Sequence, residues 1–407
     1  MLKSILILLY ITAIYAAEFD TVSIKSMYHH DTIGPLYKLQ LPQQSSPYTL
    51  KSLPGLTYRP SNRQQLIQLA KSNKLLRWTS KQTAQLRPEP YMLPDVTDHA
   101  TVLSLAEMSY NAYMELGKEG TWYDLGTQWR VNSTFGWEND GLRGHVFGNT
   151  DNSLLIIGFK GTTAGVFSGE PTGEKDKLND NLLFSCCCGK VGRGWTAVCS
   201  CNDKNNQYQC DNKCLDKSLI DSELYYDYAA NIYIDVITQY PNATVWLTGH
   251  SLGGAVATLI GQTFGVPAVS FESPGDRLAA QRLHLPQAPG LPDQPIWHFG
   301  HTADPIFIGV CTGPLSGCFY AGFAMETRCH TGKVCVWDTV KDNGWKVNIG
   351  YHRIGTIIES ILKRPDAFPL PECKVETDCD DCGLWTFRDE RDDPDSAKLK
   401  YQAVFGA

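Results

Sequence analysis

Hydrophobic residues form two kinds of pattern along this chain, and stretches of the two kinds alternate. Nearly unbroken apolar runs predict strands buried on both faces of a sheet, and the clearest are Ser153–Phe159 and Ala243–Leu247. Shorter runs at Ala268–Phe271 and Ile296–His301 predict two further strands. Elsewhere apolar residues recur every three or four positions, which predicts helices. We expect such helices from Asp98 onward and over Glu223–Tyr240. Further helices are expected over the small-residue run Ala255–Gly261 and, closing the core, over Arg353–Leu362.

Strands that alternate with helices predict an α/β fold with a mostly parallel sheet and helices on both of its faces. A chain of 407 residues is long enough to bury a full core of this kind. We divide it into a leader, a polar and proline-interrupted N-terminal extension with one helix over Gln64–Leu76, a main domain that contains a cysteine-rich insertion, and an acidic tail with further cysteines. The corresponding ranges are 1–17, 18–95, 96–365 with 163–222 as the insertion, and 366–407.

Composition narrows the class of protein. Hydrophobic residues make up 43% of the chain and charged residues 19%, which is ordinary for a globular protein. The net charge of −7 and the lack of a Lys/Arg cluster argue against a nucleic-acid partner. The fourteen cysteines fall in two regions, 186–214 and 311–382, and none lies in the first 185 residues.

The N-terminus indicates a secretory route. Lys3 precedes an apolar run, Ile5–Ala17, which suits the core of a signal peptide and is shorter than the ~20 residues that span a bilayer. Ile14 and Tyr15 make a poor cleavage site, so a cleaved signal and an uncleaved membrane anchor both stay open. In a secretory lumen thiols oxidise, and the even cysteine count allows up to seven disulfides, whose pairing the sequence does not fix.

Two further features follow from a lumenal location. Asn132 and Asn242 begin Asn-x-Ser/Thr sequons and are candidate glycan acceptors. The spacings Cys379-x-x-Cys382 and Cys199-x-Cys201 could hold zinc in the cytosol, but disulfides are favoured here. We expect no metal and no cofactor. The oligomeric state is not indicated.

The most informative motif is Gly249-His250-Ser251-Leu252-Gly253, which stands between a predicted strand and a predicted helix. Strand, Gly-x-Ser-x-Gly, helix is the nucleophile elbow of an α/β-hydrolase. The two glycines leave room where strand and helix close on each other, and the turn exposes the hydroxyl of Ser251. Ser251 is therefore the candidate nucleophile.

A serine hydroxyl needs a base to remove its proton, and the base needs a carboxylate to orient it. In α/β-hydrolases the acid and then the histidine follow the serine along the chain. Asp304 is the favoured acid because it follows the predicted strand Ile296–His301 at the sheet edge where catalytic groups gather. The competing acids are Asp276, which we expect to pair with Arg277, and Asp293 and Asp338.

Two histidines follow Asp304. His330 stands between Cys329 and Cys335, where a structural role fits it, whereas His352 precedes the closing helix and can reach back over the sheet edge. His352 is therefore the candidate base. The oxyanion hole should use the backbone N–H of Leu252 and the Gly161-Thr162 turn, where Thr162 could add its hydroxyl; an ordinary turn is the alternative.

Longer strings carry a family resemblance. From about Asp98 to about Phe387 the chain resembles the fungal autophagic-body lipases, a branch of the class 3 lipases. The strings that carry it, the triple cysteine and the last two being the most specific, are Phe159–Thr162, Lys175–Cys188, Trp246–Gly254, Ser273–Ala280 and His301–Pro305.

The resemblance implies a lipase or phospholipase that acts on membrane phospholipids and acylglycerols. It implies entry into the secretory route as a single-pass type II protein held by its N-terminal segment. It also implies passage through multivesicular bodies to the vacuole, where membranes delivered by autophagy are broken down. By matching position, it implies Ser251 as nucleophile, Asp304 as acid and His352 as base.

In class 3 lipases the segment after the oxyanion turn forms a lid, so the resemblance implies that role for Gly165–Cys214. We expect its apolar residues Leu182, Leu183 and Phe184 to touch lipid, with a rigid surface decoration as the alternative. For the whole chain, the alternatives are a soluble esterase, a serine peptidase of the same fold, or a catalytically idle membrane-binding protein.

Overall fold

The computed structural model describes most of the chain after the N-terminal segment. The described residues are 50–60, 86–117, 122–125, 129–138, 140–163, 172–189, 197–203, 208–286, 294–313 and 315–388. The leader 1–17 and the predicted helix Gln64–Leu76 lie outside them, so both stay predictions. Within the described residues, no helix has the length and apolarity needed to cross a membrane.

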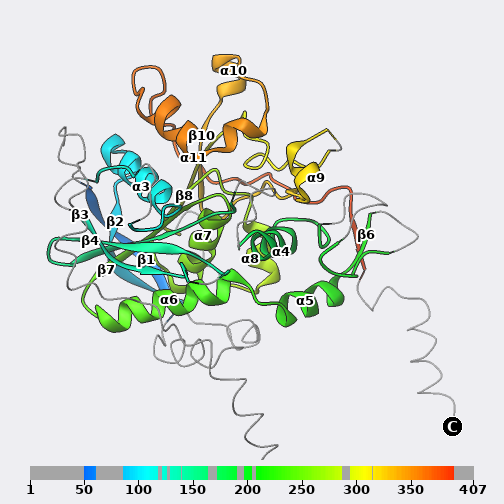
Figure 1. The fold of residues 1–407 in the computed structure, drawn as a ribbon, viewed down its shortest axis with the longest axis horizontal. Coiled ribbons are helices and arrows are strands. Elements are labelled where there is room, and N and C mark those ends of the chain that lie inside the picture. Colours follow the sequence, from blue (N-terminus) through cyan, green and yellow to red (C-terminus); the bar gives the residue numbers. More distant parts are fainter. Residues whose placement is uncertain are drawn as a thin grey trace, which may run out of the picture.

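A seven-stranded sheet forms the centre of the molecule, in the order β10-β9-β8-β7-β5-β4-β3. Its two edge strands, β10 and β3, are labelled in Figure 1. Five neighbouring strands run parallel, and β4 and β3 complete one edge in antiparallel pairing. Their bounds are β3 Trp129–Phe135, β4 Gly144–Asn149, β5 Leu154–Phe159, β7 Thr244–His250, β8 Ala268–Phe271, β9 Ile296–His301 and β10 Lys333–Trp337. The predicted α/β class with a mostly parallel sheet is confirmed, and so are its four predicted strands. The strands β3, β4 and β10 were not predicted.

Side chains of successive sheet residues enter two separate cores. In β7, Val245 and Leu247 pack on one face with helices α6 (Tyr225–Gln239) and α7 (Leu252–Phe264). Trp246 packs on the other face with α3 (His99–Asn111) and the closing helical segment. Successive residues of a strand point to opposite faces of the sheet, so β7 contacts helices on both sides.

The closing segment departs from the prediction in its geometry. A single helix was expected over Arg353–Leu362, but a short α-helix, α11 (Ile354–Thr356), passes directly into a π-helix over Ile357–Leu362. The other helices within the described residues are α4 (Gly173–Leu183), α5 (Asn212–Asp221), α8 (Arg277–Arg282), α9 (Gly317–Ala321) and α10 (Thr339–Asn343), with a 3-10 turn over Ile349–His352.

Part of the predicted N-terminal extension is built into this body. Strands β1 (Ser52–Pro60) and β2 (Leu86–Pro94) pair antiparallel. The hydroxyl of Tyr91 bonds to the backbone of Val245, and the indole of Trp246 donates to the carbonyl of Met92. The sequence predicted no strands in the extension, because prolines and polar residues interrupt its hydrophobic pattern.

All fourteen cysteines form disulfides, the full number that the even count allows. Four bridges hold the cysteine-rich insertion, one of them to the C-terminal tail, and two more tie that tail to the strand β10 region. A short strand of the tail, β11 (Thr386–Arg388), also pairs with β6 (Gln209–Asp211) of the insertion. The pairs are Cys186–Cys382, Cys187–Cys210, Cys188–Cys199, Cys201–Cys214, Cys311–Cys318, Cys329–Cys379 and Cys335–Cys373.

One expectation about the insertion is wrong in this structure. Leu182, Leu183 and Phe184 do not face lipid, because all three are buried in the core beside α6 and α7. An apolar triplet has the same sequence pattern whether it faces a core or a membrane. These three residues therefore anchor the insertion to the body.

Candidate active site

Ser251 stands in a strained turn between β7 and α7. Its φ of 56° lies in the left-handed region, which a residue with a Cβ adopts at a cost. Neighbouring glycines make the turn possible: a Cβ on Gly253 would lie 2.3 Å from the carbonyl oxygen of Phe159, and one on Gly249 would lie 2.5 Å from the backbone of Gly253. The structure therefore has the strand-turn-helix geometry that the motif predicts.

The three residues predicted as nucleophile, acid and base meet at this turn. The Oγ of Ser251 lies 2.8 Å from Nε2 of His352, and Nδ1 of the same ring lies 2.7 Å from Oδ2 of Asp304. A ring nitrogen facing a carboxylate carries the proton, so the opposite nitrogen is free to accept the proton of the serine. The arrangement can raise the nucleophilicity of Ser251.

Asp304 stays ionised in spite of its position. Burial opposes its ionisation, but the charge of His352, a hydrogen bond from Glu272 and the backbone N–H of Ile306 outweigh burial and hold the pKa of Asp304 below its usual value. The carboxylate is completely buried in the loop after β9. It can therefore orient the ring of His352 as the anion.

The other candidate acids lie elsewhere. The expected ion pair between Asp276 and Arg277 is wrong: Asp276 accepts hydrogen bonds from Thr258 and Thr331, while Arg277 donates to the carbonyl oxygens of His330 and Glu376.

Two of the rejected residues have other partners, and one lies outside the described part. Asp338 accepts hydrogen bonds at the start of α10 and from Thr302. His330 is buried beside Glu376, which fits the structural role expected for it. Asp293 is not among the described residues.

The Gly161-Thr162 turn lies against the elbow, as the oxyanion prediction requires. A Cβ on Gly161 would be 3.1 Å from Cβ of Ser251 and 2.4 Å from the carbonyl oxygen of His250. The hydroxyl of Thr162 donates to Oδ2 of Asp180 at 2.5 Å. Leu252 begins α7, so its N–H is one of the donors that a helix leaves unpaired at its first turn. Gly161 and Leu252 thus adjoin Ser251, whereas the hydroxyl of Thr162 is turned to Asp180 in this structure. The role of Leu252 and Thr162 in the reaction stays a prediction.

Buried charged groups pack against the Gly161-Thr162 turn. Lys160 donates to Thr163 and lies 3.7 Å from Asp176, whose carboxylate also accepts from Tyr225. Asp180 is buried beside them, and burial raises the pKa of Asp180 to about 8, with the charge of Asp176 adding to the shift. Thr162 is thus held by a carboxyl that keeps its proton up to neutral pH.

Sequence reasoning missed two side chains next to the triad. His250, inside the motif, bonds through Nε2 to the carbonyl oxygen of His352 at 2.7 Å and through Nδ1 to the hydroxyl of Tyr113 at 2.7 Å. Because a carbonyl only accepts, Nε2 is the protonated nitrogen. Burial, together with His352, lowers the pKa of His250 to about 3, so the ring stays neutral. The second missed side chain is Glu272, which lies beside Asp304.

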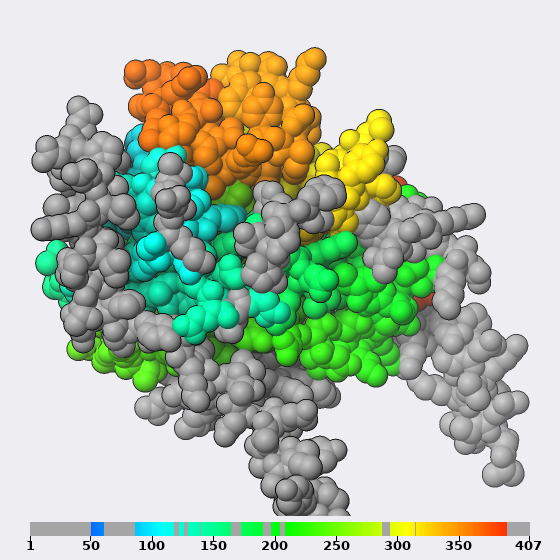
Figure 2. All heavy atoms as spheres, viewed as in Figure 1, coloured from blue at the N-terminus to red at the C-terminus, as the bar shows by residue number. Residues whose placement is uncertain are grey.

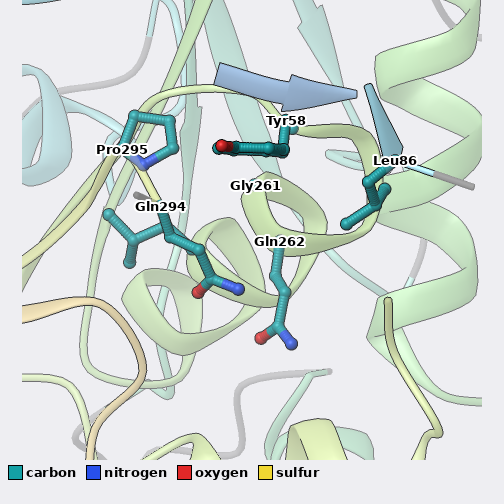
Figure 3. Close-up of a pocket in the computed structure, with 8 residues that line it drawn as sticks. Tyr58, Leu86, Gly261, Gln262, Gln294 and Pro295 are labelled. Carbon is teal, nitrogen blue, oxygen red and sulfur yellow. The ribbon is translucent and has the colours of Figure 1, made fainter. Parts of the chain in front are cut away.

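A pocket at the other end of α7 is separate from this site. Gly261 in its wall comes nine residues after Leu252, or about 14 Å along the helix. Its labelled lining residues are shown in Figure 3: Tyr58, Leu86, Gly261, Gln262, Gln294 and Pro295.

Three sulfur atoms lie close enough together to suggest a metal site. They belong to Cys188, Cys199 and Cys201. Each is already bonded to another sulfur in a disulfide, and metals bind the free thiolate. The cluster is explained by its disulfides.

Comparisons with known proteins agree with the geometry. The profile of the family Lipase (class 3) matches residues 174–266, which include Ser251. A protein of Kluyveromyces lactis named "Putative lipase ATG15" is 49% identical over 321 residues, covering 76% of this chain and 60% of that protein. One of Vanderwaltozyma polyspora with the same name is 52% identical, covering 74% and 54%. The chain thus spans less than two thirds of the length of these relatives.

Among solved structures, the Lip2 lipase from Yarrowia lipolytica aligns with a TM-score of 0.33 at 16% identity. The alignment covers 58% of this chain and 77% of that one. A likeness this weak carries no part of the argument.

Proposed function

Because the chain belongs to the fungal autophagic-body lipase family, a branch of the class 3 lipases, we propose that it is a serine hydrolase that cleaves the carboxylic ester bonds of glycerolipids in membranes. The observation that carries the proposal is the hydrogen-bonded row from Ser251 through His352 to Asp304 at a nucleophile elbow. The family name supports a lipid ester as the substrate.

The geometry supports a two-step reaction. Nε2 of His352 takes the proton of Ser251 while Oγ attacks the ester carbonyl, and the charge that develops on the carbonyl oxygen meets the N–H of Leu252 and the Thr162 turn. His352 then gives its proton to the leaving alcohol, a lysolipid or glycerol fragment, and the acyl group stays on Ser251. A water molecule activated by the same ring releases the fatty acid and restores the serine.

Membrane contact needs exposed apolar side chains near this site, and Leu182, Leu183 and Phe184 do not provide them. Leu315 and Tyr320, around α9, are 91% and 72% exposed. Val347 and Ile349, in the loop before His352, are also exposed. A Cβ on Gly317 would contact Ile349, so the two segments adjoin, as the yellow and orange surfaces do in Figure 2. We call these four residues the apolar rim, and propose that it rests on the lipid surface.

The location of the reaction is proposed on other grounds. Seven disulfides and the family support delivery through the secretory route, with the N-terminal segment as signal or type II anchor, to multivesicular bodies and the vacuole. The role there would be the breakdown of autophagic bodies and vesicle membranes.

Exposure distinguishes the two candidate glycan acceptors. Asn242 is exposed in the turn before β7, which favours it. Asn132 is half-buried in β3, and its amide nitrogen donates to Asn152 and Tyr240. Loss of one glycan mass in Asn242→Gln, and none in Asn132→Gln, would support this assignment.

The central test compares the purified chain with Ser251→Ala on phospholipid vesicles and on a triacylglycerol emulsion, measuring released fatty acid. We expect release by the wild type and none by the variant. Ser273→Ala is a matched control, since it removes a buried serine hydroxyl that bonds to Ser270 and His298 and not to the triad. Turnover of a short-chain ester or a peptide but of neither lipid would indicate a soluble esterase or a peptidase. A cellular role that survives Ser251→Ala would indicate a binding protein.

A second test addresses the apolar rim. Leu315→Ser with Tyr320→Ser should weaken vesicle binding and vesicle hydrolysis while sparing hydrolysis of a soluble short-chain ester. Leu384→Ser is the control, because Leu384 is 77% exposed but lies in the tail. Equal loss on vesicles in the control and in the rim variant would count against the rim.

A further inference from the structure

Glu272 is the most unusual residue beside the triad. It directly follows β8 with a φ of 47°, in the left-handed region that favours glycine, yet it carries a long acidic side chain. The residue is completely buried, and its N–H donates to the carbonyl oxygen of Phe299. A strained backbone and a buried carboxyl at one position indicate that the side chain has a task there.

The carboxyl of Glu272 faces two groups of the active site, at the end of β9 and in the loop after it. Oε1 lies 3.3 Å from Nε2 of His301, at the end of β9. The carboxyl is within hydrogen-bonding reach of Asp304, in the loop after β9. Asp304 in turn bonds to His352, in the 3-10 turn before α11. Glu272 therefore lies next to the acid of the triad, which itself bonds to the base.

A proton must lie between the two carboxyls. Two ionised carboxylates would repel each other, and neither could donate a hydrogen bond. Asp304 is held as the anion by His352 and by the N–H of Ile306. Burial, and then the charge of Asp304, raise the pKa of Glu272 well above its usual value, while burial lowers the pKa of His301 and keeps that ring neutral. The proton therefore belongs to Glu272.

We propose that Glu272, as a neutral carboxylic acid, donates a hydrogen bond to Asp304 and so acts as a positioning residue for the triad. The inference deepens the proposed function and rests on it. The row of hydrogen bonds then extends from Ser251 through His352 and Asp304 to Glu272. It gives the carboxylate of Asp304 a second side-chain hydrogen bond, so that one oxygen stays aligned with the ring of His352.

This role makes the alkaline side of the pH profile informative. A serine–histidine pair needs a neutral imidazole, so by itself it gives activity that rises with pH and then levels off. Loss of the proton of Glu272 would place a second anion beside Asp304 and remove the hydrogen bond. We therefore expect the activity of the wild type to fall again at alkaline pH.

The experiment compares the wild type with Glu272→Gln and Glu272→Gly, measuring kcat/KM on a short-chain ester from about pH 4 to about pH 10. The amide of glutamine can donate to Asp304 but does not titrate, so Glu272→Gln should keep most of the activity at low pH and lose the alkaline fall. Glycine suits the backbone at this φ and removes the donor, so Glu272→Gly should lower kcat about tenfold or more at every pH.

The inference is overturned if Glu272→Gln has the pH profile of the wild type, or if Glu272→Gly keeps full activity. Circular dichroism and thermal unfolding check that each variant is folded, and if the glycine variant is not, the glutamine profile decides. Ser251→Ala, measured in parallel, separates the two proposals. Turnover that does not depend on Ser251 would remove the proposed function, whereas Ser251-dependent turnover insensitive to Glu272 would remove only this inference.

Discussion

The nucleophile and the base of this site are held by very different surroundings. Ser251 lies between a buried strand and α7, in which all thirteen residues are buried. His352 follows a stretch, Lys341–Gly350, in which every residue except Trp345 is exposed. We call the first region the elbow and residues 338–352 the base loop.

A few specific contacts hold the base loop. The N–H of Asn348 donates to the carbonyl oxygen of Ala303, and the ring of Trp345 stacks on Tyr351 with centroids 4.7 Å apart. His250 donates to the carbonyl oxygen of His352 from the elbow side. The disulfide Cys335–Cys373 closes a ring that contains the whole loop.

The comparison shows that the positions of Ser251 and His352 are fixed by different kinds of interaction. Packing against a parallel sheet fixes the serine, so damage to the elbow should appear first as lost stability. Directed hydrogen bonds and one covalent link fix the histidine, so damage to the base loop should appear first as lost turnover.

The elbow should be the less tolerant region, and Gly253→Ala tests this most strongly. The new Cβ would lie 2.3 Å from the carbonyl oxygen of Phe159 and 2.7 Å from the backbone of Lys160, so α7 would have to move away from β5. We expect a loss of about 3 kcal/mol or more in the free energy of unfolding. Urea denaturation measures it, and fatty-acid release should fall at least about a hundredfold because Ser251 and Leu252 move with the helix.

Gly355→Ala is the matched change beside the base loop. A Cβ there meets nothing within 4 Å, and its φ is not positive. Stability should stay the same or rise by up to about 1 kcal/mol. A loss in this variant as large as that of Gly253→Ala would remove the contrast between the two regions.

The covalent link of the base loop is tested by replacing Cys335 and Cys373 together with alanine. Opening this ring should cost about 2–4 kcal/mol in denaturant unfolding and should also lower kcat, because His352 lies inside it. The control pair, Cys201→Ala with Cys214→Ala, opens a ring that holds no triad residue. Equal kcat in the two double variants would show that the link does not position the base.

His250 joins the two regions, and His250→Phe should separate its polar role from its packing. The aromatic ring stays, but the donor to the carbonyl oxygen of His352 is lost. We expect kcat to fall about tenfold with a small change in thermal stability. Tyr113→Phe leaves that donor in place and should lower kcat less. A larger loss of kcat in Tyr113→Phe would contradict this order.

The same contrast explains which parts of the molecule the sequence predicted. Strands β5 and β7 are buried on both faces, so their apolar runs are unambiguous, and the glycines of the elbow are required by contacts only a few residues away. Chain order narrowed the acid and the base to a few residues, and the places of Asp304 after a predicted strand and of His352 before a predicted helix selected these two. These features depend on local pattern or on order along the chain.

Other features depend on which distant residues meet. Glu272 touches Asp304 from another strand end, and nothing in the string around Glu272 marks it as buried. Leu182, Leu183 and Phe184 were assigned to lipid because hydrophobicity does not distinguish a core from a membrane. The edge strand β10 is short and lies among cysteines, and its pattern did not predict a strand.

The smallest expected effect is the change in thermal stability with pH that depends on Asp180, the carboxyl bonded to Thr162 of the oxyanion turn. Burial raises the pKa of Asp180 to about 8, against about 3.9 in an unfolded chain, so the folded state binds one more proton between these values. The stability contributed by this group is therefore complete below about pH 4 and is lost as the pH rises through about 8. Asp180→Asn keeps a neutral side chain and should reduce the fall in Tm between pH 5 and pH 8 by roughly a few degrees. Asp342 is an exposed carboxylate of the base loop, so Asp342→Asn should leave that fall in Tm unchanged. An identical dependence of Tm on pH in the wild type and in Asp180→Asn would show that the stability of the elbow does not depend on the protonation of Asp180.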